Sequence, residues 1–300
     1  MQTKVKAITQ VRAAASSKLK DFKLLVKFRL SATVVFSAVM AFLIAGTGSI
    51  NWIAVMVLAL GGFFVTAASN ALNEVLEKDY DRLMKRTADR PLATGRMSVA
   101  DAVLIAGVMG LSGITLLAMF NPWSALFGTL ALMTYAFVYT PLKRVSPIAI
   151  TVGAVAGALP MLIGCVAIQG ELTWLAFTLF ALQFMWQFPH FEAIGWLAFE
   201  DYKKAGYKLF QQKENGERTD NMGLSSMIYA LLLVPIGCLP FFLGVCGITS
   251  AIITVILSLV YAWFGWNLYK KQTRKAALQL MFSSFFYLPL VLAAMYFDKV

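Results

Sequence analysis

A stripe of oxygen-bearing side chains runs through the segment 70–82. Asn73, Glu77 and Asp81 are spaced four residues apart, so on a helix they lie along one face, about one turn from each other. Stacked carboxylates repel one another unless a cation lies between them. Ligands that are all oxygen suit Mg²⁺, which shares its coordination shell with water and phosphate oxygens. The spacing therefore predicts a magnesium site formed by these three residues.

Basic residues follow this stripe closely along the chain, at Lys85, Arg86, Arg90 and Arg96. Arginine can bind two phosphate oxygens at once, so acids that hold a metal and arginines beside them predict a site for a metal-bound diphosphate. From spacing alone, the acids could instead pair with neighbouring cations on a solvated helix end. Cytoplasmic loops of membrane proteins also carry such cations in any case, although this does not account for their mixture with acids.

His190, the only histidine of the chain, lies in a second polar window with Trp186, Glu192 and Asp201. It follows a proline near the inner end of an apolar stretch, where a helix kink would turn it toward a cavity. A lone histidine is more often a hydrogen-bonded structural residue than a ligand, although haem-iron ligation and proton transfer are both open to it. We take His190 and Trp186 as candidate substrate-binding residues, with the role of the imidazole left open.

Tyr139 and Lys143 form a third window, four residues apart, with Pro141 between them. Aromatic rings that face a polar cavity can stabilise a carbocation through their faces, which makes Tyr139 a candidate catalytic residue. The alternative is that Tyr and Lys only mark the membrane interface, where both are common.

The apolar composition determines the fold class. Of the 300 residues, 59% are hydrophobic and 14% are charged, which lies outside the range of soluble domains. A helix that crosses the bilayer needs about 20 mostly apolar residues, and such stretches recur along almost the whole chain. The sequence therefore predicts an all-α polytopic membrane protein with nine transmembrane helices. The predicted spans are 30–49, 52–72, 101–119, 123–141, 147–168, 172–195, 223–246, 249–269 and 277–297.

The distribution of Lys and Arg tests this topology independently. With nine spans, 25 of the 26 Lys and Arg residues fall on the side of the amino terminus, and only Lys299 falls on the other. Because these cations are retained on the cytoplasmic side, we predict a cytoplasmic amino terminus. The net charge of +11 then suits the anionic headgroups of the lipid bilayer and an anionic substrate. It does not indicate nucleic-acid binding, because no soluble domain exists to carry it.

One membrane domain accounts for the chain. We expect a cytoplasmic amino-terminal segment at 1–29 and a nine-helix domain at 30–297. The two long inner loops, 73–100 and 196–222, lie on the same side, which predicts that the protein works at that face. The three cysteines are odd in number, fall in or at the outer end of spans and lack the spacing of metal ligands, so we predict packing roles for them. They are Cys165, Cys238 and Cys246.

These motifs together resemble a known family. The run from Asn73 through Glu77 and Asp81 to Arg86 and Arg90 resembles the first Asp-rich signature of the UbiA-type intramembrane prenyltransferases. The resemblance is closer still to the branch that farnesylates protohaem IX, and it covers about residues 25–297. The stretches that carry this narrower resemblance are 139–144, 153–160 and 186–191, of which the Trp-Gln-Phe-Pro-His string at 186–190 is the most specific.

The resemblance implies a nine-helix bundle in a bacterial inner membrane, with a cavity that opens toward the lipid. It implies transfer of the farnesyl group of farnesyl diphosphate to a vinyl group of haem B, with water added, giving haem O and diphosphate. The downstream haem A synthase is then a candidate partner. By position, Mg²⁺ would be bound by Asn73, Glu77 and Asp81, and diphosphate by Arg86, Arg90 and Lys143.

The second acidic motif of the family corresponds to Asp201, which we expect to be catalytic. Ala205 stands where a second acid is usual, and this puts a second metal site in doubt. Glu77 stands where Asp is usual in the wider family. A sister enzyme that prenylates a quinone precursor would share the acidic site and differ in its acceptor pocket. A secondary transporter would carry its polar residues near the bilayer midplane, whereas these cluster at one face.

Overall fold

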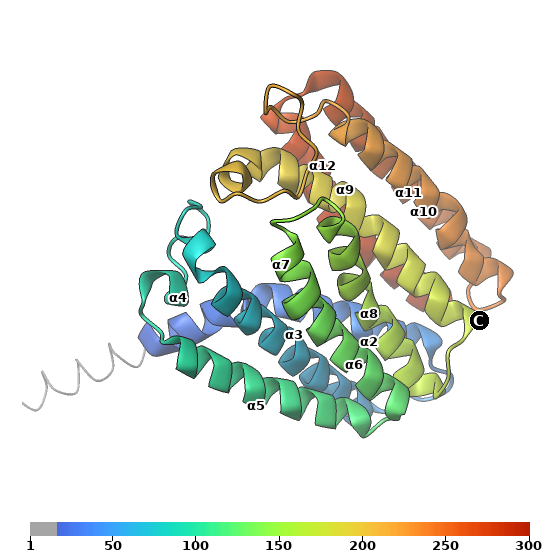
Figure 1. Ribbon diagram of the computed structural model, residues 1–300. Helices are drawn as coiled ribbons and strands as arrows, with labels where there is room; N and C mark the ends of the chain where they lie inside the picture. Colours follow the sequence, from blue (N-terminus) through green and yellow to red (C-terminus); the bar gives the residue numbers. More distant parts are fainter. Residues whose placement is uncertain (1–16) are drawn as a thin grey trace, which may run out of the picture.

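The computed structural model describes residues 17–300, so predictions that concern residues 1–16, a part of the expected segment 1–29, lie outside the described residues. Within 17–300, a helical segment at 17–25 leads into a helical bundle (Figure 1), which confirms the predicted all-α membrane fold. The long helices are α2 (Phe28–Ala45), α3 (Trp52–Asp81), α5 (Val99–Ala118), α6 (Pro122–Met133), α8 (Ala149–Gln169), α9 (Trp174–Lys204), α10 (Met222–Phe242), α11 (Ile248–Lys271) and α12 (Arg274–Phe297).

Eight helices in the described part of the chain are long and apolar enough to cross a membrane, when α6 is taken together with its continuation to Leu142. They coincide with eight of the nine predicted spans. The remaining span, predicted at 172–195, corresponds to α9. Its 31 residues exceed the length that a bilayer requires, but polar side chains make its inner half less apolar than the other spans. Since α9 packs against α8, α10 and α12, it is part of the same bundle.

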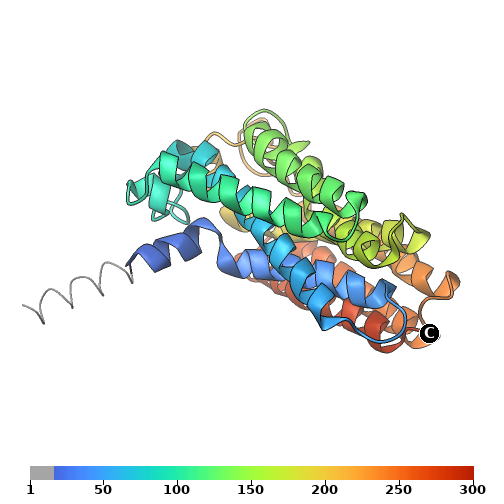
Figure 2. The same ribbon diagram turned by 90° about the horizontal axis from the view of Figure 1, so that it is seen from below.

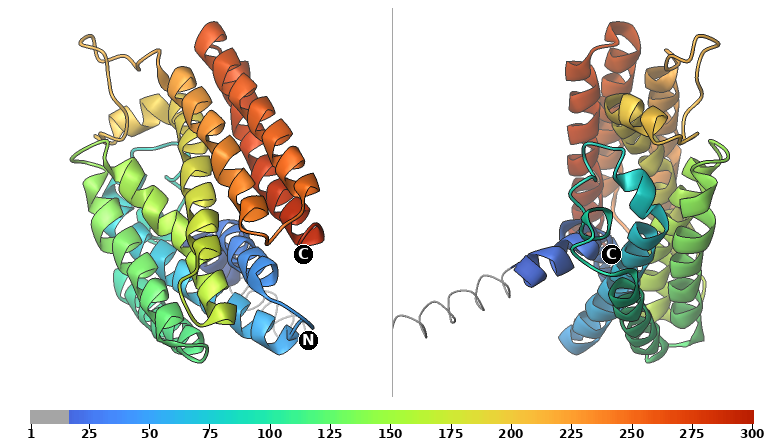
Figure 3. Two further views of the ribbon diagram at one scale, coloured as in Figure 1. Left: turned by 90° about the vertical axis from the view of Figure 1, so that its right-hand side faces the viewer. Right: turned by 60° about the vertical axis from the view of Figure 1, so that its left-hand side comes forward.

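The helices α3 and α9 extend well beyond their predicted ends, to Asp81 and Lys204 respectively. Both extensions lead into the long loops, 82–98 and 205–221, which lie at the same end of the bundle (Figure 3). The carboxyl terminus lies at the opposite end (Figures 1 and 3). The extension of α3 places the acidic stripe on a helix, as its spacing predicted.

The span predicted at 123–141 changes its winding at the inner end. α6 passes into a π-helix, η1 (Thr134–Tyr139), and then into the short helix α7 (Thr140–Leu142). Pro141 accounts for the change, because it has no N–H to donate and its ring crowds the carbonyl of the preceding turn. The wider π-helical turn relieves that contact. In this turn the hydroxyl of Thr140 donates to the carbonyl of Tyr135 at 2.9 Å.

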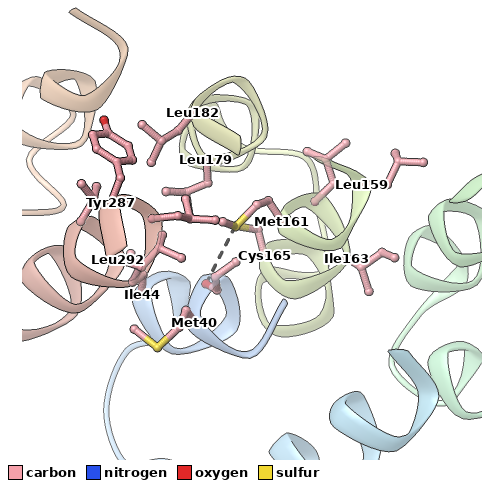
Figure 4. Packing of buried hydrophobic residues seen from close by; sticks show 14 of the residues in the cluster. Met40, Ile44, Leu159, Met161, Ile163, Cys165, Leu179, Leu182, Tyr287 and Leu292 are labelled. Atoms are coloured by element: carbon pink, nitrogen blue, oxygen red, sulfur yellow. Dashed lines mark hydrogen bonds between the residues drawn. The ribbon is translucent and has the colours of Figure 1, made fainter. Parts of the chain in front are cut away.

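The central core forms where α2, α8, α9 and α12 meet. Figure 4 shows side chains from these four helices in contact, among them Met40, Met161, Leu179 and Leu292. Cys165 is buried within this cluster, with its thiol 4.0 Å from the carbonyl oxygen of Ala41. Cys165, Cys238 and Cys246 are all free, and the first and last are buried, which confirms the packing role predicted for those two.

A small residue allows α5 to pack closely against α3, the helix from which it diverges at an angle in Figure 2. A Cβ atom added at Gly113 would be 2.8 Å from the backbone nitrogen of Val65 and 2.9 Å from the carbonyl oxygen of Gly61. Neither backbone atom can move without displacing α3, the helix that carries the acidic stripe. Gly107, on the same helix, has open space around it.

Gly113→Ala is therefore expected to lower the free energy of unfolding of the purified protein by about 1–3 kcal/mol, the range for overpacked cores. Its Tm should fall accordingly. Gly107→Ala serves as the matched control and should leave stability equal or slightly higher, because alanine is the better helix former. Thermal unfolding in detergent, followed by the loss of monodisperse protein, measures both. Equal stability of the two variants would contradict the close packing of α5 on α3.

Candidate active site

The acidic stripe of α3 faces the interior of the bundle, at the end that carries the long loops. Asn73, Glu77 and Asp81 are 1%, 5% and 0% exposed, although all three are polar. Buried polar groups of this kind need hydrogen-bond partners or charges of opposite sign. The structure supplies one cation to each of them, and each cation comes from a different segment.

The three contacts are short. The ammonium of Lys27 donates to Asn73 Oδ1 at 2.8 Å, and the ammonium of Lys143 donates to Glu77 Oε1 at 2.8 Å. The guanidinium of Arg90 donates to Asp81 Oδ2 at 2.7 Å. The amide of Asn73 also donates to the hydroxyl of Thr140 at 3.0 Å, which connects the stripe to the π-helical turn.

Lys27 is a member of this site that the sequence did not reveal. It lies between the helical segment 17–25 and α2, in the left-handed region with φ 45°, which residues other than glycine rarely adopt. This turn lets the side chain reach Asn73 from outside the span. Burial lowers the pKa of Lys27 well below its ordinary value, and the neighbouring charges of Arg90 and Lys143 lower it further. In sequence, Lys27 is only one of several cations expected in a cytoplasmic segment.

The loop 82–98 is tied to α3 by contacts that hold Arg90 in place. Glu74 accepts a hydrogen bond from the backbone N–H of Leu92 at 3.2 Å, in the short helix α4 (Pro91–Thr94) that follows Arg90. Arg82 donates to the carbonyl of Ala93 at 2.6 Å. Burial acts to lower the pKa of Arg90, but the carboxylates of Asp81, Glu74 and Glu77 outweigh it and the pKa lies above its ordinary value. Arg90 is therefore always charged.

The donor atoms of the stripe fit a hard divalent cation. Among residues 17–300, no three His, Cys, Asp or Glu side chains group closely enough to hold a metal by themselves; the stripe offers one amide and two carboxylates. Asp81 Oδ1 and Glu74 Oε2 are buried without a hydrogen-bond partner in the described structure. Such orphaned carboxylate oxygens are unusual. An incomplete set of oxygen ligands suits Mg²⁺, which completes its shell with water and phosphate oxygens.

An apolar cavity of about 220 Å³ lies between α2, α3, α8 and α9. It extends from Asn70, one turn before Asn73, to His190 on α9. Its wall is mostly apolar and aromatic, as expected for a compartment that excludes water. The residues that line it include Tyr135, Tyr139, Trp186, Gln187, His190 and Phe191.

Two glycines of α8 create room in this cavity. A Cβ atom at Gly153 would collide with the ring of Tyr139, and one at Gly157 would collide with the side-chain amide of Gln187. The ring of Tyr139 in turn lies 4.4 Å from the ammonium of Lys143. The glycines thus allow Tyr139 to lie between the cavity and the charged cluster.

Trp186 and His190 form a stacked pair at the other end of the cavity. Their ring centroids are 5.3 Å apart and the rings are nearly parallel, at 12°. The indole N–H of Trp186 donates to the carbonyl of Ser284 on α12 at 2.9 Å. The pair is therefore positioned by α12, where Ser284 lies 98 positions after Trp186 in the chain.

Comparison with known proteins identifies the fold and the family. The model of the UbiA prenyltransferase family matches residues 34–288. The chain belongs to this family. A protein of Cytophaga hutchinsonii named protoheme IX farnesyltransferase is 42% identical over 286 residues, which is 95% of this chain and 99% of that protein. The family assignment therefore holds over nearly the full length of both chains.

Solved structures of the UbiA family share the fold. A digeranylgeranylglyceryl phosphate synthase superposes with a TM-score of 0.77 at 19% identity, covering 94% of this chain and 98% of that one. A UbiA homologue from Archaeoglobus fulgidus bound to DMAPP and Mg²⁺ superposes with a TM-score of 0.70 at 18% identity, covering 92% and 99%. The bundle described above is thus the UbiA fold.

Two of the expected site residues of this UbiA family member lie apart from the buried ion pairs. Arg86 is exposed and forms no ion pair with any residue from 17 to 300. Asp201, near the end of α9, is half-buried, and its carboxylate makes no hydrogen bond or ion pair within the same range. The grouping of Arg86 with Arg90 and Lys143, implied by the family pattern, is therefore not present in this arrangement.

Tyr207 is a second residue of the site that sequence reasoning missed. It belongs to the loop 205–221, which contacts α7 through a hydrogen bond from the N–H of Lys208 to the carbonyl of Lys143 at 2.7 Å. The Tyr207 hydroxyl is buried and makes no hydrogen bond of ordinary geometry among the described residues, although it lies close enough to the Glu77 carboxylate to interact with it. Burial raises its pKa, and the carboxylates of Glu77 and Asp81 raise it further. The hydroxyl therefore keeps its proton and can donate toward the acidic stripe or to a ligand bound beside it.

Tyr207→Phe is expected to weaken substrate binding without lowering stability. The hydroxyl makes no hydrogen bond of ordinary geometry within 17–300, and its neighbour Glu77 keeps the 2.8 Å bond to Lys143, so its removal leaves no other described group unsatisfied. If it donates to a bound diphosphate, its loss should raise KM for the prenyl diphosphate by about 3–10-fold, with little change in Tm. Steady-state kinetics and thermal unfolding measure the two effects. Unchanged KM together with unchanged Tm would show that the hydroxyl does not contact the substrate.

Proposed function

We propose that this protein transfers the farnesyl group of farnesyl diphosphate to a vinyl group of protohaem IX, with addition of water, to give haem O and diphosphate. The observation that carries this proposal is the 42% identity, over nearly the full length of both chains, to a protein named protoheme IX farnesyltransferase. The charged cluster at one end of an apolar cavity fits this reaction, because it separates a diphosphate site from an apolar acceptor site. The same relative favours a porphyrin acceptor over a quinone precursor.

The donor site is the acidic stripe with its three cations. Asn73, Glu77 and Asp81 would hold Mg²⁺, a proposal supported by the orphaned Asp81 oxygen and by the UbiA homologue that binds DMAPP and Mg²⁺. When bound, the cation neutralises charge that develops on the departing diphosphate. Lys27, Lys143 and Arg90 would donate to the diphosphate oxygens.

The ion pairs of the described structure explain how the site tolerates burial without substrate. Glu77 is paired with Lys143 and Asp81 with Arg90, while Glu74 accepts from the backbone N–H of Leu92. The same residues could accept a divalent cation together with an anionic diphosphate, because the charges of the two largely cancel. In the loaded site, Glu77 and Asp81 would serve the metal, and Lys143 and Arg90 would donate to the phosphate oxygens. Arg86 and Asp201, which have no partners within 17–300, are free to join the loaded site.

The chemistry that follows is an electrophilic alkylation. The bond between farnesyl C1 and the diphosphate oxygen breaks, and its electron pair leaves with diphosphate. The vinyl group of the porphyrin forms a bond to C1, and water adds to the resulting benzylic-type cation and loses a proton. The rings of Tyr135 and Tyr139 line the cavity, where their faces stabilise the allylic cation. Exclusion of water until the carbon–carbon bond forms prevents hydrolysis to farnesol.

The direction of the protein in the membrane follows from its charges. The long loops lie at the end of the bundle where α3 ends with the acidic stripe, and the carboxyl terminus lies at the other end (Figure 3). The excess of Lys and Arg in the loops of the charged end supports a cytoplasmic amino terminus, in the inner membrane of a bacterial cell. Haem O released in the membrane would be taken up by the downstream haem A synthase.

Mass spectrometry of haems tests this function directly. Cells that express the gene in a background without haem O should accumulate a haem whose mass equals haem B plus farnesyl and hydroxyl. The purified protein should form the same product from haem B, farnesyl diphosphate and Mg²⁺. Formation of a prenylated quinone precursor instead of this haem would overturn the acceptor while retaining the prenyltransferase chemistry.

A further inference from the structure

Ser284 determines which nitrogen of His190 carries its proton. The Ser284 oxygen lies 2.7 Å from His190 Nδ1 and 2.5 Å from the carbonyl oxygen of Met281, to which its hydroxyl donates. A hydroxyl has one proton, and the carbonyl of Met281 can only accept. The Ser284 oxygen therefore acts as the acceptor toward the imidazole. Nδ1 of His190 must carry the ring proton, and Nε2 must hold a lone pair.

The ring of His190 is also fixed in orientation. It is stacked on Trp186 at 12° and meets the edge of Phe285 at a centroid distance of 5.2 Å. Ser284 itself is fully buried, and it anchors both rings: its hydroxyl binds His190 and its carbonyl binds Trp186. His190 thus has little freedom to rotate or to exchange its proton with water.

The hydrogen bond of the His190 ring within residues 17–300 is made by Nδ1 and leaves Nε2 free, and the residue lines the cavity of the proposed acceptor. A neutral imidazole with Nδ1–H bonded to an oxygen and a free Nε2 is the arrangement found in histidines that bind metals. The chain has no other histidine. The cavity wall around it is aromatic and apolar, which suits a porphyrin face.

We propose that Nε2 of His190 is an axial ligand of the iron of the acceptor haem, and that Ser284 is the positioning residue that holds the imidazole in the required tautomer. This inference rests on the proposed function, because it takes haem B as the acceptor. Ligation places the porphyrin plane across the His190 end of the cavity. The allylic cation forms at the other end, beside Tyr139, so the ligand fixes the distance between the porphyrin edge and farnesyl C1. The cavity of about 220 Å³ would hold only a part of the porphyrin, so the rest of the macrocycle would lie outside it.

Spectra of bound haem test the ligand without any turnover. The purified full-length protein is titrated with ferric haem B and, in parallel, with metal-free protoporphyrin IX. Wild-type protein should give the absorption and electron paramagnetic resonance spectra of imidazole-ligated iron. His190→Gly should lose them, and added imidazole should restore them. Binding of the metal-free porphyrin should not change in this variant, because it has no iron to ligate.

Ser284→Ala tests the positioning role. It should weaken ferric haem binding by about 10-fold, the effect expected when the second partner of a metal-bound histidine is removed, and leave the metal-free porphyrin unaffected. Ser284→Thr keeps the hydroxyl and should restore affinity. Ser283→Ala is the matched control on the same helix, since that hydroxyl donates only to the carbonyl of Leu280 at 2.8 Å.

The outcomes separate this inference from the proposed function. A His190→Gly protein that binds ferric haem with the wild-type spectrum would overturn iron ligation, even if haem O is formed. Equal losses for the metal-free porphyrin and for haem would overturn it too, because they would indicate a collapsed cavity. Failure of the wild-type protein to form haem O, with imidazole-ligated haem still observed, would overturn the proposed reaction and leave the ligand assignment intact.

Discussion

Asp81→Asn is expected to reduce the turnover of farnesyl diphosphate by at least about 100–1,000-fold, the effect of removing one group that stabilises charge in a transition state. Asp81 is fully buried, and its Oδ1 has no partner among residues 17–300. Asparagine has the same shape and can still accept a hydrogen bond from Arg90. The variant therefore keeps the fold and loses the negative charge that would bind Mg²⁺.

The matched control is Asp89→Asn. Asp89 lies in the adjoining loop, its side chain is 82% exposed and it pairs with Arg96 at 2.9 Å. Surface ion pairs contribute little to stability, so this variant should keep nearly full activity. Release of diphosphate from farnesyl diphosphate at a series of Mg²⁺ concentrations measures both variants. An Asp81→Asn enzyme with wild-type activity and an unchanged Mg²⁺ requirement would show that Asp81 is not a metal ligand.

Lys143→Met is expected to lower kcat/KM for farnesyl diphosphate by about 100-fold, because it removes a charged hydrogen bond to the departing group. Methionine keeps the length and the apolar stem of the side chain. The substitution also leaves the carboxylate of Glu77 without its 2.8 Å partner in a buried position. Loss of one partner from a buried ion pair destabilises a protein by about 3–5 kcal/mol, so Tm should fall as well.

A double variant distinguishes the loss of stability from the loss of chemistry. Glu77→Gln combined with Lys143→Met removes both charges and should recover much of the lost Tm, while activity stays low. Lys208→Met is the control for the loss of a lysine at this face, because its side chain is exposed and only its backbone contacts Lys143. Recovery of activity in the double variant would mean that Lys143 acts through Glu77 alone and does not bind diphosphate.

The elements that position the site were predictable because their signals are local. Length and apolarity determine where a helix can cross the bilayer, and the predicted spans match helices of the bundle to within a few residues, apart from the longer inner ends of α3 and α9. The spacing of Asn73, Glu77 and Asp81 depends only on the helical repeat. For the same reason the sequence alone is enough to propose these three residues as a magnesium site.

The partners of those residues depend on the tertiary structure. Lys27 and Asn73 are 46 positions apart in the chain, and Lys143 and Glu77 are 66 apart, so no periodic pattern relates them. Arg86 and Arg90 look equivalent in sequence, yet only Arg90 is folded onto Asp81. The left-handed turn at Lys27 and the buried hydroxyl of Tyr207 likewise depend on how the segments outside the long helices pack against the bundle.

His190 shows most clearly which properties of the site the sequence predicts and which ones the tertiary structure decides. Its position after a proline in an apolar stretch suggested a cavity-facing residue, and the sequence left its role open. Its tautomer is decided by Ser284, 94 positions away on α12, because a single hydroxyl proton already bound to a carbonyl leaves only an acceptor for the imidazole. The sequence by itself determined the spans, the charged face and the acidic stripe, which follow from hydrophobicity and helical repeat. The pairing of charges and the state of His190 required the packed bundle, since only packing brings distant side chains within hydrogen-bond distance.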